Sequence, residues 1–471
     1  MAEDDIEDVE TASTIPAKTF FVSMLTRDIE LDDAILDLLD NCIDGVIRSK
    51  PGEGDRPYEG FKAKLHLSAE RFQLEDNCGG IPYEIAKTRA FRLGRPPEEG
   101  EVEGHRTVGV YGIGMKRAIF KLGRDSSVVS DGDRAFRVDI ERDWLESDEW
   151  SPLELKPTEI DEKGKGGTVI TVENLYPGVI AKLSDTSWIE NLRQYISDHY
   201  AIIIEKGFSV SIEAKGISKD PITPAPFYLA VSGDLGGEGV QPFVYRGKFE
   251  GVTVEVYAGL LAPPLDEEEL EEREGEQEGR TQAGWTIACN DRVVVSKDRT
   301  YLTGWGTAGV PSYHGQYTVI AGIALLYSDD VGELPLTTTK RGLDASSIIY
   351  AKLLDVMREA TKKLTSFTNS WKTKEARREP LGEARPRSLA MIRDFDGTKA
   401  VTSGQFKGLE VYRPELPKPP SKKRQPRVSF AAEERELGAL REFFENPDLK
   451  NGEIGRLAFE EALAEAGYAS R

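Results

Sequence analysis

Apolar residues follow a helical period early in the chain and a two-residue alternation soon after it. Between residues 29 and 47 the apolar positions recur every three to four residues, which predicts an amphipathic helix. The segment FKAKLHLS alternates apolar and polar residues and predicts a strand, and RFQLEDN predicts a second strand that ends in a CGGIP turn. Residues 83–93 are expected to be helical, residues 94–112 suit a glycine-rich loop, and GMKRAIFKLG begins another helix.

Further strands are expected in SSVVS, AFRVDIER and GGTVITVENL. This order indicates an α+β sandwich, with helices on one face of a mainly antiparallel sheet. A second unit is expected from about Leu183, with a helix near residues 187–205, strands at GWTIACNDRVVVS and YTVIAGIALLYS, and a helix after LDASS. The pattern near the C-terminus predicts two more helices, in FAAEERELGALREFFENP, ended by Pro447, and in EIGRLAFEEALAEAG.

The chain has 471 residues, which is too long for one ordinary domain and indicates two or three. Shifts in composition suggest where the divisions fall. The expected parts are a disordered acidic N-terminus (1–17), a first α/β domain (18–180), a second α/β domain (181–372) with an acidic insert (264–282), a basic linker (373–428) and a helical C-terminal segment (429–471).

Charge and cysteine usage narrow the class of protein. The formal net charge of −21 argues against a protein that coats nucleic acid with its whole surface, although residues 372–427 carry 15 Lys/Arg against 7 Asp/Glu. No apolar run approaches the roughly 20 residues of a membrane span, and the acidic N-terminus lacks the features of a signal peptide. The three cysteines form no CxxC motif, so we expect a protein of the reducing cytoplasm.

The helix expected first carries two polar residues suited to chemistry. Asp37 and Asn41 are four residues apart, so they project from one face of the helix, one above the other. A carboxylate can orient or deprotonate a water molecule, and an amide oxygen beside it suits magnesium, which prefers oxygen ligands. A solvated polar helix face would show the same spacing, so this motif alone leaves both interpretations open.

Three further motifs follow in order along the chain. Asp76, at a strand end, can accept a hydrogen bond from an exocyclic amine such as that of adenine, although an ordinary Asx/Gly turn is the alternative. The run GVYGIGMK (residues 109–116) opens a helix, where backbone N–H groups can cradle an anion. It does not follow a strand in a βαβ unit, which disfavours a dinucleotide fold. Thr168, on a late strand, could complete an adenine pocket.

The order of these motifs resembles that of the GHKL ATPase superfamily, which includes gyrases, heat-shock chaperones, histidine kinases and MutL proteins. The carboxylate-xxx-Asn pair, the Asp-Gly box, the glycine lid and the Gly-Thr strand match its four sequence boxes in sequence, over residues 20–175. The resemblance implies a Bergerat-type ATP-binding α/β sandwich that holds ATP and Mg²⁺ between helices and a lid.

The resemblance also implies roles for the motif residues. Asn41 would hold magnesium, Asp76 would recognise the adenine amine, and Thr168 would support that contact through water. Asp37 stands at the position of the general base. The implied nucleotide-binding residues are Asn41, Asp76, Gly80, Gly94, Gly109, Gly112, Ile113, Gly114, Met115, Lys116 and Thr168.

A further motif lies in the expected second domain. The segment LPLTTTKRGL (residues 334–343) resembles the end of the transducer domain, an S5-type α/β fold, in the gyrase, MutL and microrchidia branches. There a lysine reaches the γ-phosphate, which makes Lys340 the second catalytic candidate; an ordinary surface lysine is the alternative. Tyr111, Lys116 and the TTTK run are most similar to the microrchidia-like branch and its prokaryotic relatives.

Two positions depart from the superfamily pattern. The general base is usually Glu, and Asp37 is one methylene shorter. We therefore expect slow hydrolysis, because a misplacement of about 1 Å can cost about a hundredfold in rate. Cys78 stands where the Asp-Gly box usually has glycine, and it fits there only if its φ is negative.

Three functions are compatible with these motifs. The first is an ATP-gated dimeric clamp, a slow ATPase acting on duplex DNA through the basic stretch or on a DNA-processing partner, in prokaryotic phage defence or genome maintenance. The second is a non-hydrolysing ATP-dependent switch that recruits a protein, such as a nuclease, through the C-terminal helices. The third, a chaperone-like ATPase, is disfavoured because the TTTK segment differs from the chaperone's middle domain.

Overall fold

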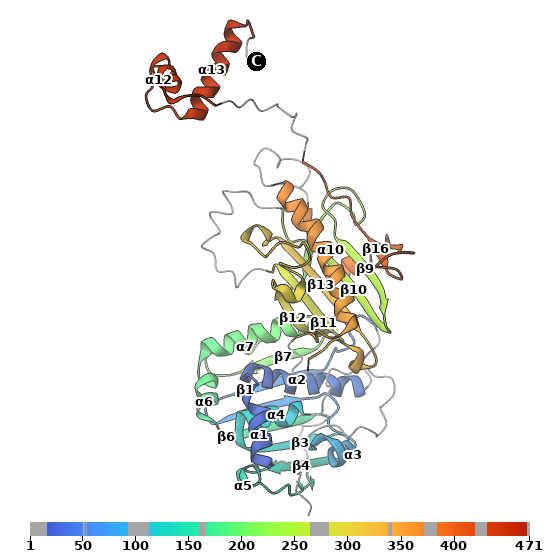
Figure 1. The fold of residues 1–471 in the computed structure, drawn as a ribbon. Helices are drawn as coiled ribbons and strands as arrows, with labels where there is room; N and C mark the ends of the chain where they lie inside the picture. Colours follow the sequence, from blue (N-terminus) through green and yellow to red (C-terminus); the bar gives the residue numbers. More distant parts are fainter. Residues whose placement is uncertain are drawn as a thin grey trace, which may run out of the picture. The chain divides into compact units, whose positions relative to one another are not determined.

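The computed structural model divides the chain into two compact units, Met1–Pro419 and Pro420–Arg471. It describes residues 17–49, 52, 54–92, 113–159, 166–263, 282–337, 342–371, 384–419 and 431–468. Within the first unit, two seven-stranded sheets organise the helices (Figure 1). The mixture of helix and sheet agrees with the expected α+β class.

The first sheet has the strand order β5-β4-β3-β6-β2-β1-β7. Its pairings are antiparallel except between β1 and β7, which are parallel. The elements of this part are α1 (Lys18–Arg27), α2 (Leu31–Arg48), β1 (Lys62–Leu67), β2 (Arg71–Asp76), α3 (Tyr83–Ile85), η1 (Ala86–Ala90), α4 (Gly114–Leu122), β3 (Gly123–Asp131), β4 (Ala135–Ile140), α5 (Arg142–Glu146), β5 (Lys156–Pro157), β6 (Thr168–Leu175), α6 (Pro177–Leu183), α7 (Thr186–His199), α8 (Ala201–Glu205) and β7 (Ser209–Glu213).

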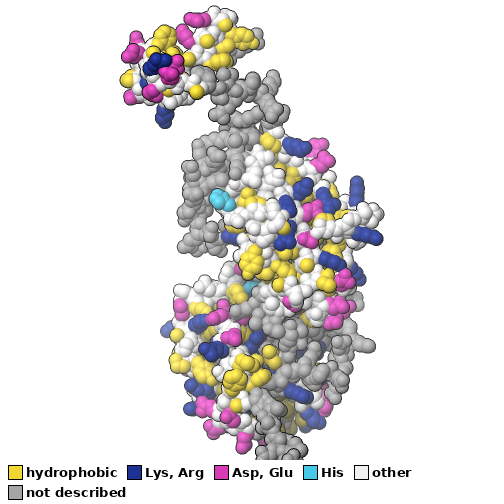
Figure 2. Space-filling model, viewed as in Figure 1, with side chains coloured by type: hydrophobic (Ala, Val, Ile, Leu, Met, Phe, Trp, Pro, Cys, Tyr) yellow, Lys and Arg dark blue, Asp and Glu magenta, His cyan; other side chains and the backbone are white. Residues whose placement is uncertain are grey.

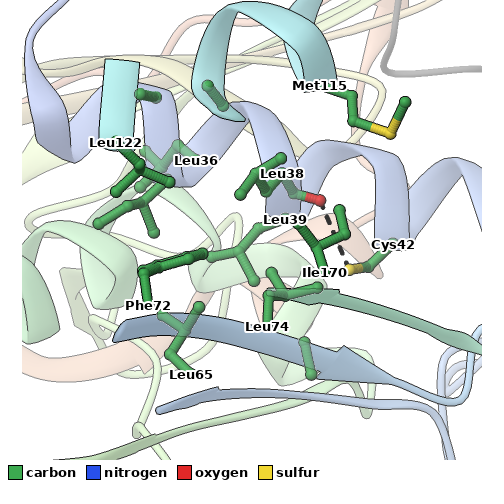
Figure 3. Close-up of a cluster of buried hydrophobic side chains, with 14 of the residues drawn as sticks. Leu36, Leu38, Leu39, Cys42, Leu65, Phe72, Leu74, Met115, Leu122 and Ile170 are labelled. Atoms are coloured by element: carbon green, nitrogen blue, oxygen red, sulfur yellow. Dashed lines mark hydrogen bonds between the residues drawn. The ribbon is translucent and has the colours of Figure 1, made fainter. Parts of the chain in front are cut away.

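The alternating sequences of β1 and β2 bury every second side chain, as their pattern predicts. Helix α2 packs its apolar residues onto that face, and α4 packs against α2. Figure 3 shows Leu39 of α2 above Phe72 and Leu74 of β2, with Ile170 of β6 beside them. Burial of this apolar surface is the main force that holds α2 on the sheet.

The first sheet extends beyond the expected domain boundary near residue 180. Strand β7 pairs with β1 in the register Ala63↔Val210, and residues of α7 and α8 join the same core as α2. The difference arises because β7 and β1 are far apart in sequence, and their pairing leaves no local sign in either strand.

The second sheet has the order β12-β11-β13-β10-β9-β16-β15. Helix α10 packs across β10, β13 and β9, and Trp285 of β11 donates from Nε1 to Oγ1 of Thr361 at 3.0 Å. The elements are β8 (Tyr228–Ser232), β9 (Phe243–Phe249), β10 (Val252–Leu260), β11 (Gly284–Cys289), β12 (Arg292–Asp298), η3 (Tyr301–Thr303), η4 (Gly315–Tyr317), β13 (Ile320–Tyr327), η5 (Val331–Glu333), α10 (Ile348–Ser370), β14 (Ala384–Ser388), α11 (Leu389–Arg393), β15 (Lys399–Ala400) and β16 (Glu410–Tyr412).

Residues 384–412 depart from the expectation of a basic linker. Strand β16 joins the second sheet between β9 and the edge strand β15, and β14 pairs with β8 in a separate two-stranded sheet. The guanidinium of Arg246 donates to the carbonyls of Phe395, Ile392 and Arg393, which fastens the end of α11 to the sheet. These elements could not be predicted from composition because they are short and largely exposed, so few of their residues are apolar in a regular pattern.

The unit Pro420–Arg471 contains the two expected C-terminal helices, α12 (Glu434–Phe443) and α13 (Asn451–Glu465). Ile454 is buried between them, while Phe443, Phe459 and Tyr468 are exposed. Figure 2 shows apolar and acidic side chains next to each other on this unit. Among the helices described in both units, none is long and apolar enough to cross a membrane.

Candidate nucleotide-binding site

Helix α2 presents Asp37 and Asn41 on one face, as their spacing predicts. The Nδ2 of Asn41 donates to the backbone carbonyl of Asp37 at 2.8 Å. Asn41 is exposed, whereas Asp37 is buried. An exposed amide beside a buried carboxylate is a geometry in which a hard metal ion and a water molecule could be held side by side.

The carboxylate of Asp37 is paired with Arg117 of α4, a residue that sequence reasoning missed. Oδ2 of Asp37 accepts from Nη2 of Arg117 at 2.5 Å and from Nε at 3.1 Å, and both side chains are buried. Helix α4 lies against Asp37 at Gly114, where an added Cβ would be in ordinary van der Waals contact with Cβ and Cγ of Asp37 at 3.4 Å. The guanidinium therefore competes with water for this carboxylate.

Asp76 lies at the end of β2 with its carboxylate buried among backbone donors. Its Oδ1 accepts from the backbone N–H of Cys78 at 2.8 Å and of Thr168 at 3.3 Å, and the thiol of Cys42 lies 3.5 Å from Oδ2. Burial raises the pKa of Asp76, and these hydrogen bonds oppose that rise only in part. The contacts with Cys78 and Thr168 bring the second and fourth motifs together.

The turn after Asp76 depends on glycine. Gly80 has a φ of 65°, and a Cβ there would lie 2.4 Å from the carbonyl oxygen of Asp131. A Cβ on Gly167 would lie 1.8 Å from the carbonyl oxygen of Asp76. Cys78 is not among the described non-glycine residues with positive φ, so its backbone meets the condition for replacing a glycine.

Replacing Gly167 by Ala is expected to destabilise the first sheet by about 3 kcal/mol, because the added methyl overlaps the backbone of Asp76. The midpoint of urea unfolding would measure the loss. Gly178→Ala is the matched control, since nothing lies within 4 Å of a Cβ there. Equal midpoints for the two variants would contradict the close approach at Gly167.

Thr168 is held by Ser130, a second residue that sequence reasoning missed. The two hydroxyl oxygens are 3.0 Å apart, and Oγ of Ser130 also accepts from the backbone N–H of Ile81 at 2.8 Å. Ser130 is on β3, which pairs with β6 in the register Ser130↔Thr168. This cross-strand pair fixes the Thr168 hydroxyl next to the Asp76 turn.

Helix α4 begins at the end of the glycine run, with Ile113 as its N-cap and Gly114 as its first residue. Gly114, in the first turn, lies against Asp37. The backbone N–H groups at the start of a helix favour anions. Met115 and Lys116 are buried, with Met115 above the α2 core in Figure 3. Four predicted residues, Gly94, Gly109, Gly112 and Lys340, lie outside the described residues.

The ammonium of Lys116 donates to the carbonyl of Ala90 at 2.8 Å, at the end of η1. This described contact ties α4 to η1, whereas the resemblance implies a nucleotide-binding role for Lys116. Burial lowers the pKa of Lys116 to about 8.

This lowered pKa predicts a pH-dependent stability. Between pH 8 and the ordinary lysine pKa the unfolded chain binds the Lys116 proton more readily than the folded chain, so the free energy of unfolding rises with pH in that window. The full rise is roughly 3 kcal/mol. Urea unfolding from pH 7 to 10.5 should show this slope in the wild type and lose it in Lys116→Met. Lys121→Met, at a more exposed lysine of the same helix, should keep it.

A cavity of about 750 Å³ lies elsewhere in the first unit, against α1, α4, α5 and α6. Its lining includes Val22, Phe120 and Val179 and contains none of the residues of the candidate nucleotide site. Within the described residues, no group of three or more His, Cys, Asp and Glu side chains could hold a metal ion. A magnesium ion here would therefore depend on Asn41, water and the nucleotide.

The sequence comparisons concern the same part of the chain. Residues 29–167 match the family model of the Histidine kinase-, DNA gyrase B-, and HSP90-like ATPases, and no curated protein matches the chain. The matched segment contains Asp37, Asn41 and Asp76 and ends next to Thr168. The match supports a GHKL-type ATPase domain over residues 29–167, and with it ATP binding by this part of the chain.

Proposed function

We propose that the protein binds ATP with magnesium at this site, hydrolyses it slowly and uses the nucleotide state as a switch. The observation that carries the proposal is the buried carboxyl of Asp76, held by the backbone N–H groups of Cys78 and Thr168 within the segment that matches the ATPase family model or next to it. Asn41 would hold the magnesium ion, which neutralises phosphate charge when bound. The first turn of α4 would face the phosphates.

Slow hydrolysis follows from the surroundings of Asp37. The Asp37 side chain is one methylene shorter than the Glu usual at the general-base position, and its carboxylate is paired with Arg117. A water molecule would have to approach from the side of Asp37 that the guanidinium leaves open, and small errors of position are costly in rate. The same ion pair supports a second candidate function, an ATP-dependent switch that recruits a partner protein without hydrolysis.

The proposed client is duplex DNA or a DNA-processing partner, in a microrchidia-like role in genome maintenance or phage defence. ATP would bring two ATPase domains together, and Lys340 would contact the γ-phosphate. The part of the basic stretch that the structure describes supports DNA binding less than its composition does. Arg393 is paired with Glu255 and Arg413 with Glu359, so these charges are already satisfied within the chain. Any DNA contact would use other Lys and Arg residues of the stretch.

Equilibrium binding and steady-state turnover of ATP, each with and without duplex DNA, test this proposal. We expect magnesium-dependent ATP binding, slow turnover, and a doubled mass with a non-hydrolysable ATP analogue. Tight ATP binding without turnover would exclude the ATPase and favour the second candidate function, a switch that recruits a partner protein without hydrolysis. Absence of ATP binding by the folded protein would overturn the proposal.

A further inference from the structure

The turn that joins β11 to β12 in the second sheet, residues Asn290–Arg292, is buried. It packs against helices that cover the first sheet. Asn290 and Asp291 have φ values of 47° and 67°, as a tight two-residue hairpin turn requires. Asn290 exchanges hydrogen bonds with Ser328, which follows β13, at 3.0 and 3.1 Å. The turn is therefore anchored in its own sheet, and the next two side chains reach outward.

Arg292 contacts helix α2 directly. Its Nε donates to Oδ1 of Asp40 at 2.9 Å, and its guanidinium lies 4.6 Å from the ring centroid of Tyr200. Tyr200 donates to the same Asp40 oxygen at 2.5 Å, and Nη1 of Arg292 donates to the carbonyl of His199 at 3.3 Å. Asp40, Arg292 and Tyr200 are all buried, so water screens this ion pair little.

Asp291, next to Arg292 in the turn, makes an ion pair of opposite polarity with Lys206. Both of its carboxylate oxygens accept from Nζ of Lys206 at 2.7 Å, and Tyr58 donates to Oδ2 at 3.1 Å. Two neighbouring residues of opposite charge thus meet partners of the opposite sign. Exchange of the two contacts would bring like charges together in a buried place, so the charges favour the observed register.

Asp40 lies between Asp37 and Asn41 in the same turn of α2. A helix turn moves as a unit, so the side chain that holds Asp40 also sets the position of the face that carries Asp37 and Asn41. The contact with the second sheet is therefore made on the helix of the candidate nucleotide site itself.

We propose that Arg292 is a positioning residue for the nucleotide site. Its ion pair with Asp40 fixes the setting of α2, and thereby the placement of Asp37 and Asn41, and it carries any displacement of α2 to β12 and the second sheet. The expected effect on kcat rests on the proposed ATP hydrolysis, whereas the expected effect on the placement of α2 does not.

The test compares Arg292→Met with Lys297→Met. Lys297 is on the same strand and pairs with Asp198 of α7 at 2.9 Å, so it joins the same two parts without touching α2. We expect Arg292→Met to lower kcat for ATP about tenfold to a hundredfold. The affinity for ATP measured without magnesium should change less than threefold, because Asp76, the proposed adenine contact, is not on α2. Arg292→Lys should recover part of kcat, and Lys297→Met should leave both quantities unchanged.

A nucleotide-free measurement separates this inference from the proposed function. Hydrogen exchange of residues 31–48 should be at least tenfold faster in Arg292→Met than in the wild type and unchanged in Lys297→Met, whether or not the protein hydrolyses ATP. If Arg292→Met fails to fold, the paired variant Asp40→Leu with Arg292→Met removes both buried charges and should fold while keeping the kcat defect. Equal effects of Arg292→Met and Lys297→Met on exchange or kcat would overturn the inference.

Discussion

Asp76→Asn is expected to lower the affinity for ATP about a hundredfold while the protein stays folded. The amide oxygen can still accept from the N–H groups of Cys78 and Thr168, so the turn is preserved. The amide nitrogen then takes the place of Oδ2 and presents a donor to the adenine amine, which is also a donor. Loss of a charge-assisted hydrogen bond and this mismatch together cost about 3 kcal/mol.

Calorimetric titration with ATP and GTP would measure the effect. Because guanine carries a carbonyl where adenine has its amine, the preference for ATP over GTP should fall in Asp76→Asn. Glu75→Gln, on the other face of the same strand, should bind as the wild type does. Burial raises the pKa of Asp76, so wild-type affinity should fall on acidification at a higher pH than an ordinary aspartate would give. Unchanged ATP affinity in Asp76→Asn would remove Asp76 from the site.

Asp37→Asn is expected to lower ATP turnover at least a hundredfold and to change ATP affinity less than threefold. An amide cannot take up a proton, and general-base catalysis contributes about a hundredfold to ten-thousandfold. The amide oxygen can still accept from Arg117, so α2 and α4 should remain packed. Steady-state phosphate release and nucleotide binding, measured on the same preparation, check the two halves of this prediction.

The ion pair with Arg117 decides which substitution is informative. Asp37→Ala would leave a buried guanidinium without its carboxylate, and breaking a buried pair costs about 3–5 kcal/mol, so lost activity could reflect unfolding. Asp32→Asn, in the first turn of the same helix, is the control for a lost carboxylate on α2. Undiminished turnover in Asp37→Asn would show that another group orients the water.

Much of the architecture near the site could be predicted from the sequence. The period of α2, the alternation of β1 and β2 and the order of the four motifs each depend on residues close together in the chain. The resemblance implied a water-mediated role for Thr168 beside Asp76, whereas the structure shows the backbone N–H of Thr168 donating directly to Oδ1 of Asp76. The sequence indicated that Cys78 can replace a glycine only if its φ is negative. Whether φ is negative there is decided by the folded turn.

The partners of these residues were not predictable, because they come from distant parts of the chain. Arg117 is 80 residues from Asp37, Ser130 is 38 from Thr168, and Arg292 is 252 from Asp40. Each is an ordinary polar residue in its own segment, and its role appears only when two elements meet in one register. For the same reason the sequence did not predict that β7 joins the first sheet or that residues 384–412 form strands paired with β8 and β9.

From the sequence alone, the resemblance to the ATPase superfamily selected the candidate nucleotide residues. Local apolar periodicity predicted the helix and strands that carry them, since it sets which face of an element is buried. The tertiary structure alone decided how those residues are restrained. It paired Asp37 with Arg117, tied Lys116 to Ala90 and fastened α2 to the second sheet through Asp40 and Arg292. Burial is the physical reason, because a charge removed from water must find a partner, and only packing decides which partner is within reach.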